Sequence, residues 1–104
     1  MDNTKKYRKI IKDVILKYAL LRPSHGNIRL DPIFDEKNDR YVLMQTGWDL
    51  TGRVKGNLIY ITLLGEKVYI EYDGIENGIF DDLVQAGIPE NNIELPYLTE
   101  LKRA

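Results

Sequence analysis

Apolar residues recur at every third or fourth position near the start of the chain. The residues in this stripe are Tyr7, Ile10, Ile11, Val14, Ile15, Tyr18 and Leu21. Their spacing predicts an amphipathic helix with one buried face. Asn3 or Thr4 is suited to cap its N-terminus, because a short polar side chain can accept hydrogen bonds from the unpaired N–H groups there. Pro23 ends the helix, since a residue before proline is disfavoured in the helical region.

Alternating apolar and polar residues follow a turn at residues 23–26. The alternation predicts four strands at residues 27–35, 40–48, 53–64 and 67–72, joined by turns at residues 36–39, 49–52 and 65–66. Pro32 indicates that the first strand lies at an edge of the sheet or contains a bulge, because proline cannot donate a hydrogen bond to a neighbouring strand.

The same alternation assigns side chains to the two faces of the sheet. In the second strand one face carries Tyr41 and Leu43, and the other carries Val42, Met44 and Trp48. In the fourth strand one face carries Val68, Ile70 and Tyr72, and the opposite, wetter face carries Tyr69 and Glu71.

A second helix is predicted over residues 75–86. Its apolar stripe consists of Ile79, Phe80, Leu83 and Val84. Asp73 or Glu76 near its start would interact favourably with the helix dipole. Gly87 fits the left-handed position that follows a helix, and Pro89 prevents the helix from continuing.

The order of these elements predicts an α+β fold. We expect an N-terminal helix, a four- to five-stranded antiparallel meander, a second helix and a short C-terminal extension, with both helices on one face of the sheet. Residues 93–96 are expected to be extended, and residues 97–104 to be weakly helical or frayed. The 104 residues are expected to form one domain spanning residues 1–104.

Composition limits where the protein works. No cysteine is present, which excludes disulfides and cysteine-based zinc sites. No run approaches the roughly 18 apolar residues that a membrane helix needs, and residues 1–9 lack the apolar segment of a signal peptide. A cytoplasmic protein without membrane association is therefore expected.

The charge is unevenly spread although the net charge is only −1. Residues 1–22 hold seven Lys and Arg against two Asp, whereas residues 66–104 hold nine Asp and Glu against three Lys and Arg. The chain therefore combines a basic first helix with an acidic C-terminal part.

Residues suited to catalysis are scarce. Ser24 and His25 are the only serine and histidine, and they are neighbours in a turn, where a base rarely reaches its nucleophile. The Glu100-Leu-Lys102 tripeptide is similar to part of a metal-dependent nuclease site, but it lies in a terminal segment rather than on rigid strands. No enzyme activity, metal or other cofactor is expected.

Two groups of residues are candidates for binding. Lys5, Arg8, Lys9 and Lys12 can share one side of the first helix, where they would serve as a solvated face, as a protein contact or as a contact to nucleic acid. The second group is aromatic and consists of Trp48, Tyr60, Tyr69 and Tyr72. Tyrosine and tryptophan are enriched at interfaces, so self-association through an uncovered sheet face or a strand edge is expected.

A series of short motifs resembles a known family. The motifs are Tyr7-Arg-x-Ile-Ile11, Tyr18-Ala19, Pro23-Ser-x-Gly26, Ile33-Phe-Asp35, Asp39-x-Tyr41, Gly47-Trp48, Arg53-Val-x-Gly56, Asp73-Gly-x-Glu76 and Leu83-Val-x-Ala-Gly-Ile-Pro89. They occur in the order and at the intervals of the XisI family, the fdxN-element excision controlling factors of cyanobacteria. The resemblance covers residues 7 to about 95.

The resemblance implies an accessory factor in the excision of a DNA element, working with a XisH-type protein partner and alongside a site-specific recombinase. It supplies no catalytic residues. The chain departs from the family where a histidine is usual in the third strand, which here reads Tyr60-Ile-Thr62, and in its C-terminal tail from Leu95 to Ala104. The leading hypothesis is a non-enzymatic regulatory protein bound to a XisH-type partner. The alternative is a DNA-binding accessory factor that uses the basic first helix.

Overall fold

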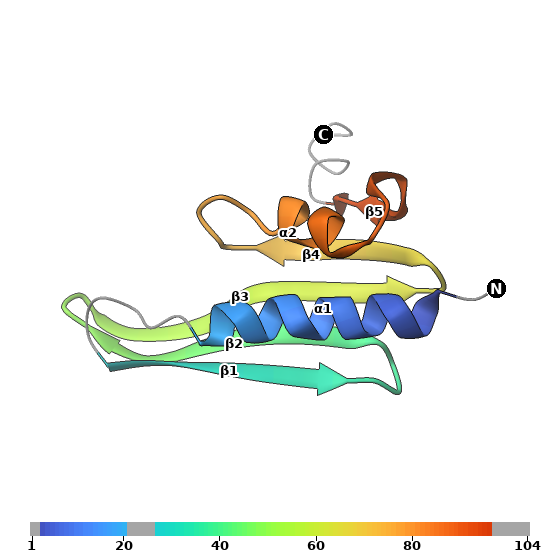
Figure 1. Cartoon of the computed structure of the whole chain (residues 1–104). Coiled ribbons are helices and arrows are strands. Elements are labelled where there is room, and N and C mark those ends of the chain that lie inside the picture. The colour runs from blue at the N-terminus through green and yellow to red at the C-terminus, as the bar shows by residue number, and fades with distance from the viewer. Residues whose placement is uncertain (1–2, 21–26, 97–104) are drawn as a thin grey trace.

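The computed structural model describes residues 3–20 and 27–96 (Figure 1). Its elements in chain order are helix α1 (Thr4–Ala19), strands β1 (Asn27–Asp35), β2 (Arg40–Asp49), β3 (Gly52–Leu64) and β4 (Lys67–Asp73), helix α2 (Phe80–Ala86), the 3-10 helix η1 (Glu90–Asn92) and strand β5 (Ile93–Glu94). The strands form one sheet in the order β1-β2-β3-β4-β5. The predicted α+β fold, with its N-terminal helix, antiparallel meander and second helix, is confirmed.

The fifth strand departs from the predicted all-antiparallel arrangement. β5 pairs with β4 in parallel, with Val68 opposite Ile93 and Tyr69 opposite Glu94. A parallel partner can be reached only by a crossover connection, and α2 and η1 supply it between β4 and β5. The other strand pairs are antiparallel, so the sheet is mixed.

Both helices lie on one face of the sheet, where the core forms (Figure 1). The apolar stripe of α1 is buried as predicted, through Tyr7, Ile10, Ile11, Val14 and Ile15. The sheet contributes Tyr41, Leu43, Ile59, Ile61, Leu63, Val68 and Ile70. Full burial of one such side chain contributes about 1.5–3 kcal/mol, so this apolar layer is the main source of stability. Leu21 and Pro23 lie outside the described residues.

The N-terminus of α1 is held by the β3–β4 turn rather than by a capping side chain. Asn3 occupies the cap position as predicted, but its side chain makes no capping hydrogen bond. Instead, the Asn3 N–H donates to Glu66 Oε1 at 3.3 Å, and the Thr4 hydroxyl donates to the Gly65 carbonyl at 3.1 Å. A tertiary contact has therefore replaced the local one.

The edge position indicated by Pro32 is confirmed, because β1 stands first in the strand order. The turn that follows it, residues 36–39, is also as predicted. The Asp35 carboxylate accepts hydrogen bonds from the side-chain amide and the backbone N–H of Asn38, at 2.9 and 3.1 Å, and these bonds lower the pKa of Asp35. This is the turn chemistry expected of Asp and Asn.

Two bulges alter which side chains share a face. Leu43 pairs with Ile59 and Met44 pairs with Asn57, so Leu58 is an extra residue in β3. Tyr60 pairs with Tyr72 and Ile61 pairs with Ile70, so Glu71 is an extra residue in β4.

The predicted face of Tyr72 is therefore wrong. A bulge breaks the alternation of side chains along a strand, and Tyr72 lies on the uncovered face with Tyr60 and not with buried Val68 and Ile70.

The predicted start of the second helix is also wrong. Residues 75–79 are not helical, and α2 begins at Phe80. The Asp73 carboxylate accepts hydrogen bonds from the N–H groups of Ile75, at 3.1 Å, and of Ile79, at 2.8 Å. Such local bonds compete with helix formation, and Gly78 has a left-handed φ of 75°. The segment therefore folds into a loop around Asp73.

The end of α2 is as predicted. Gly87 follows the helix with φ 123°. The Gly87 N–H donates to the Val84 carbonyl and the Ile88 N–H donates to the Leu83 carbonyl, both at 3.1 Å. This is a Schellman motif, in which the residues at the two ends of the longer bond make an apolar contact. Leu83 and Ile88 are both buried.

Candidate interaction surfaces

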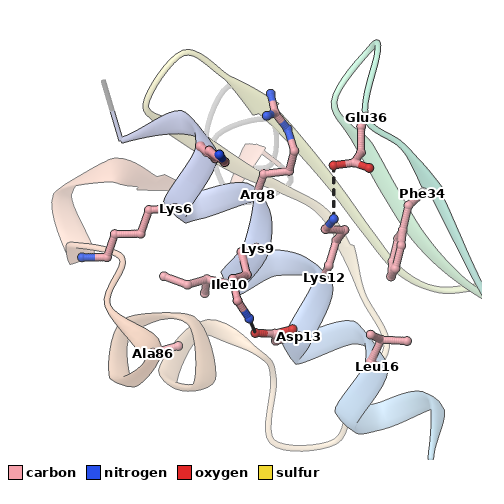
Figure 2. A pocket seen from close by; sticks show the side chains of 11 residues that line it. Lys6, Arg8, Lys9, Ile10, Lys12, Asp13, Leu16, Phe34, Glu36 and Ala86 are labelled. Atoms are coloured by element: carbon pink, nitrogen blue, oxygen red, sulfur yellow. Dashed lines mark hydrogen bonds and ion pairs between the residues drawn. The ribbon is translucent and has the colours of Figure 1, made fainter. Parts of the chain in front are cut away.

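The basic side chains of α1 are largely paired with carboxylates. Arg8 Nε lies 2.8 Å from Asp39, Lys12 Nζ lies 3.1 Å from Glu36, and Lys9 Nζ lies 2.8 Å from Asp13 one turn along the helix. Figure 2 shows Lys12 and Lys9 pointing toward these partners. Of the four predicted basic residues, Lys5 alone has no acidic partner within the described part of the chain.

Arg8 belongs to a partly buried network that holds α1 to the β1–β2 turn. Arg8 Nε and Nη2 donate to the two Asp39 carboxylate oxygens at 2.8 and 3.2 Å, and Arg8 Nε also lies 3.1 Å from Tyr41 Oη. The Tyr41 hydroxyl donates to Asp39 Oδ1 at 2.7 Å. The Arg8 hydrogen bond lowers the pKa of Asp39, whereas burial is the main cause that raises the pKa of Tyr41. Arg8 therefore has a structural task.

A second network ties α1 to α2. Lys17 Nζ lies 2.9 Å from Asp82, and the Tyr18 hydroxyl donates to the same carboxylate. That hydrogen bond raises the pKa of Tyr18 to about 12. Burial raises the pKa of Asp82, but hydrogen bonds from Tyr18 and Lys17 outweigh it and lower the pKa. Asp82 therefore neutralises one more cation of α1.

The surface along α1 is hollowed between the helix and its neighbours. Apolar Ile10, Leu16 and Phe34 lie in this hollow among the ion-paired side chains (Figure 2). Because most cations here are paired, the hollow offers an amphipathic surface and little unpaired positive charge.

The opposite face of the sheet carries the aromatic group. Tyr60 and Tyr72 are direct cross-strand partners, and Tyr69 lies opposite Thr62 on the same face. The structure therefore brings the three tyrosines together on this face. The Tyr60 hydroxyl accepts a hydrogen bond from Arg40 at 2.9 Å. Arg40 thus orients one ring of this cluster.

This face also exposes apolar side chains to solvent. Its exposed apolar side chains are Ile33, Trp48, Leu64 and Tyr72, with 53%, 59%, 61% and 48% of their surface accessible. Trp48 lies apart from the tyrosines, because it is six residues along β2 from Val42, the partner of Tyr60, or about 20 Å. Large apolar patches rimmed by polar residues mark interaction sites.

Arg53 and Lys55 were not among the residues predicted to bind. Trp48 pairs with Arg53 and Thr46 with Lys55, so both cations lie on the uncovered face. The uninterrupted alternation predicted for residues 53–64 would have placed them on the helix side.

Among the residues that the structure describes, no three His, Asp or Glu side chains are grouped closely enough to hold a metal ion. Ser24, His25, Glu100 and Lys102 lie outside those residues. No helix in the described ranges is long and apolar enough to cross a membrane.

Comparison with known proteins adds the family. The sequence model described as XisI protein matches residues 1–104. The chain belongs to the XisI family. Two solved structures of XisI relatives, both from Anabaena variabilis ATCC 29413, are similar to it. No curated protein matches the chain.

The first of these two relatives is described as a XisI-like protein. It is 23% identical, with a TM-score of 0.80 over 88% of this chain and 84% of that one. The second is described as fdxN element excision controlling factor XisI. It is 35% identical, with a TM-score of 0.71 over 90% of this chain and 91% of that one. The XisI fold therefore extends over most of the chain.

Proposed function

We propose that this XisI-family chain is a non-enzymatic controlling factor that acts in the excision of a DNA element by binding a XisH-type protein. The family and the 35% identity to a protein described as an fdxN element excision controlling factor support the general role. The proposal of a protein partner is supported by the exposed residues on the uncovered face of the sheet.

The part of that face around the tyrosines has residues typical of a protein interface. The tyrosine cluster of Tyr60, Tyr69 and Tyr72 lies beside apolar Leu64, which is 61% exposed. Interface centres are enriched in aromatic and apolar residues and depleted of charge. Contact with a partner would remove Leu64 and Tyr72 from water, which is a favourable change of about 25 cal/mol for each Å² of apolar area buried.

The test is to mix the chain with a XisH-type protein at near-physiological salt and to measure the mass of the complex by light scattering after size exclusion. Leu64→Glu with Tyr72→Glu should abolish the complex, because it would bury two charges without partners. Leu16→Glu is the matched control on the helix side, where Leu16 is 42% exposed. A complex that never forms, or that only Leu16→Glu disrupts, contradicts the proposal.

The same measurement on the chain alone tests the homo-oligomer. If two copies associate through the tyrosine cluster, Leu64→Glu with Tyr72→Glu should return the mass to that of a single 12.1 kDa chain. A mass that does not change with protein concentration or with this double substitution argues against self-association through this face.

Nucleic-acid binding through α1 is the weaker alternative. Three of its four predicted residues, Arg8, Lys9 and Lys12, are engaged with carboxylates. Phosphate contacts would have to displace those carboxylates first. Lys9→Glu with Lys12→Glu should therefore have little effect on any DNA binding, and loss of DNA binding in this variant would revive the alternative.

A further inference from the structure

The end of the sheet formed by the β2–β3 hairpin projects away from the helices. In Figure 1 the hairpin, together with the start of β1, extends past α1 and β4. β4 pairs with β3 from Ile59 onward, and the described pairing of Gly52–Asn57 is with β2. No residue of this end with a described side chain is fully buried, from Gln45 to Asn57. Both faces of the hairpin are therefore accessible.

Two cations at this end have no partner within the part of the chain that the structure describes. Arg53 and Lys55 are exposed, and neither has an ion pair or hydrogen-bonded side chain among the residues described. Arg29 lies on the same face, opposite Thr46, but is bound to Asp31 at 2.8 Å. The contrast with α1 is clear, since most cations of α1 are already paired.

An exposed indole adjoins these cations. Trp48 is 59% exposed and lies directly across from Arg53 on the same face. Opposed residues in an antiparallel pair have Cβ atoms about 5 Å apart. Lys55 is two residues further along β3, about 7 Å away on the same side of the sheet. Trp48, Arg53 and Lys55 together are called the hairpin-end patch below.

The backbone beside this patch is closely packed. A Cβ atom at Gly47 would lie 1.9 Å from the Asn27 carbonyl oxygen, so the absence of a side chain lets the start of β1 approach β2. This approach keeps β1 paired with β2 as far as Trp48, whose partner is Asn27. Trp48 therefore projects from a three-stranded platform and not from a free ribbon.

We propose that the hairpin-end patch binds single-stranded nucleic acid, with a base stacked on Trp48 and phosphates bound by Arg53 and Lys55. Proteins that bind single strands combine cations along the backbone path with aromatic rings on which unpaired bases stack. The charge of the patch is complementary to phosphates. Only an unpaired base can stack on the accessible indole, which favours a single strand over a duplex. The tyrosine cluster, about 20 Å away along the strands, is left for the protein partner, so this proposal does not rest on that one.

Trp48 is the only tryptophan in the chain, so tryptophan fluorescence reports directly on the hairpin-end patch. A poly-dT oligonucleotide should quench its emission on titration into the wild-type chain alone. A duplex of random sequence and poly-glutamate serve as the other two probes. With two phosphate contacts on a single strand, the affinity should fall about sevenfold between 50 and 200 mM salt.

Variants are measured by the polarisation of a labelled oligonucleotide. Arg53→Gln with Lys55→Gln should remove the salt dependence, and Trp48→Ala should weaken binding about 5- to 150-fold, the range for loss of one stacked base. Lys9→Gln with Lys12→Gln changes the charge equally on α1 and should leave binding unchanged. Trp48, Arg53, Lys55 and Lys9 are exposed and Lys12 is partly exposed, so circular dichroism should show all variants folded.

Several results would overturn the proposal. The first is Trp48 emission that saturating oligonucleotide leaves unchanged. The second is an equal loss of oligonucleotide affinity in the hairpin and α1 variants. The third is quenching by the duplex or by poly-glutamate that matches quenching by the single strand. None of these results bears on the complex with a XisH-type protein, so the two proposals can fail separately.

Discussion

Replacement of Asp39 tests the network that joins α1 to the sheet. Asp39 is the described non-glycine residue with a positive φ, 53°, and its carboxylate accepts hydrogen bonds from Arg8 and from the buried Tyr41. Its backbone carbonyl also accepts the N–H of Leu63 at 3.0 Å. Asp tolerates the left-handed conformation better than most residues because its short side chain bonds locally. The Asp39 side chain therefore makes the left-handed backbone tolerable, pairs with Arg8 and accepts the hydrogen bond of the Tyr41 hydroxyl.

Two substitutions separate these roles. Asp39→Asn keeps the shape, the left-handed tolerance and one acceptor oxygen for Tyr41 and Arg8 Nε, but loses the charge and the acceptor of Arg8 Nη2, so it should lower the free energy of unfolding by about 1 kcal/mol. Asp39→Ala removes the acceptor of the Tyr41 hydroxyl and of Arg8, and it removes the short polar side chain that makes a left-handed backbone tolerable, so it should cost about 3 kcal/mol.

Urea denaturation followed by circular dichroism at neutral pH measures both changes in the free energy of unfolding, and thermal denaturation followed in the same way gives the midpoint temperature. For a domain of this size, 1 kcal/mol corresponds to roughly 4–8 °C in the midpoint of thermal unfolding, so the two variants should differ by at least 8 °C. Lys9→Ala is the control, because its pair with Asp13 is 75% and 58% exposed and should contribute under about 0.5 kcal/mol. If Asp39→Ala costs no more than Lys9→Ala, the network does not hold α1 as described.

Three further predictions concern single residues. Gly47→Ala should lower the free energy of unfolding by about 2–5 kcal/mol, because its Cβ would overlap the Asn27 carbonyl and its φ is 150°. Gly87→Ala should cost only about 1–2 kcal/mol for the unfavourable backbone conformation at φ 123°, because the atoms nearest to its Cβ lie at an ordinary 3.5 Å. Equal losses of the two variants in urea denaturation would contradict this reasoning. Asp82 has a lowered pKa when folded, so its stabilising effect is present above the unfolded pKa of about 3.9 and is lost as pH falls through the folded value; thermal unfolding from pH 2.5 to 6 should show the wild type and Asp82→Asn converging at the acid end. The Tyr18 phenol should titrate near pH 12 by its ultraviolet absorbance, and Asp82→Asn should lower this pKa toward its ordinary value, with burial and Asp73 still raising it.

Local patterns predicted most of the fold because they are set by nearest neighbours. The span of β1 and the end of α2 at Gly87 depend on alternation and on a left-handed glycine, and both agree with the structure. The start of α2 does not, because the Asp73 carboxylate binds N–H groups up to six residues away. A periodicity argument carries no information about such a bond.

The binding surfaces were harder to predict for the same reason. Arg8 and Lys12 pair with Asp39 and Glu36, which are 31 and 24 residues distant along the chain. The sequence of the helix alone therefore overestimates its unpaired positive charge. The faces of Arg53 and Tyr72 depend on bulges in the pairing of strands, which alternation within one strand cannot reveal.

The bulge at Leu58 also bears on how chain length can vary in this family. Removing Leu58 would leave Asn57 adjacent to Ile59, and the pairing of both residues with β2 would remain as it is. A deletion elsewhere in β3 would shift the hairpin loop or exchange the faces of the residues beyond it. Relatives one residue shorter in this strand are therefore expected to carry the gap at this position, with a straighter strand and an unaltered loop.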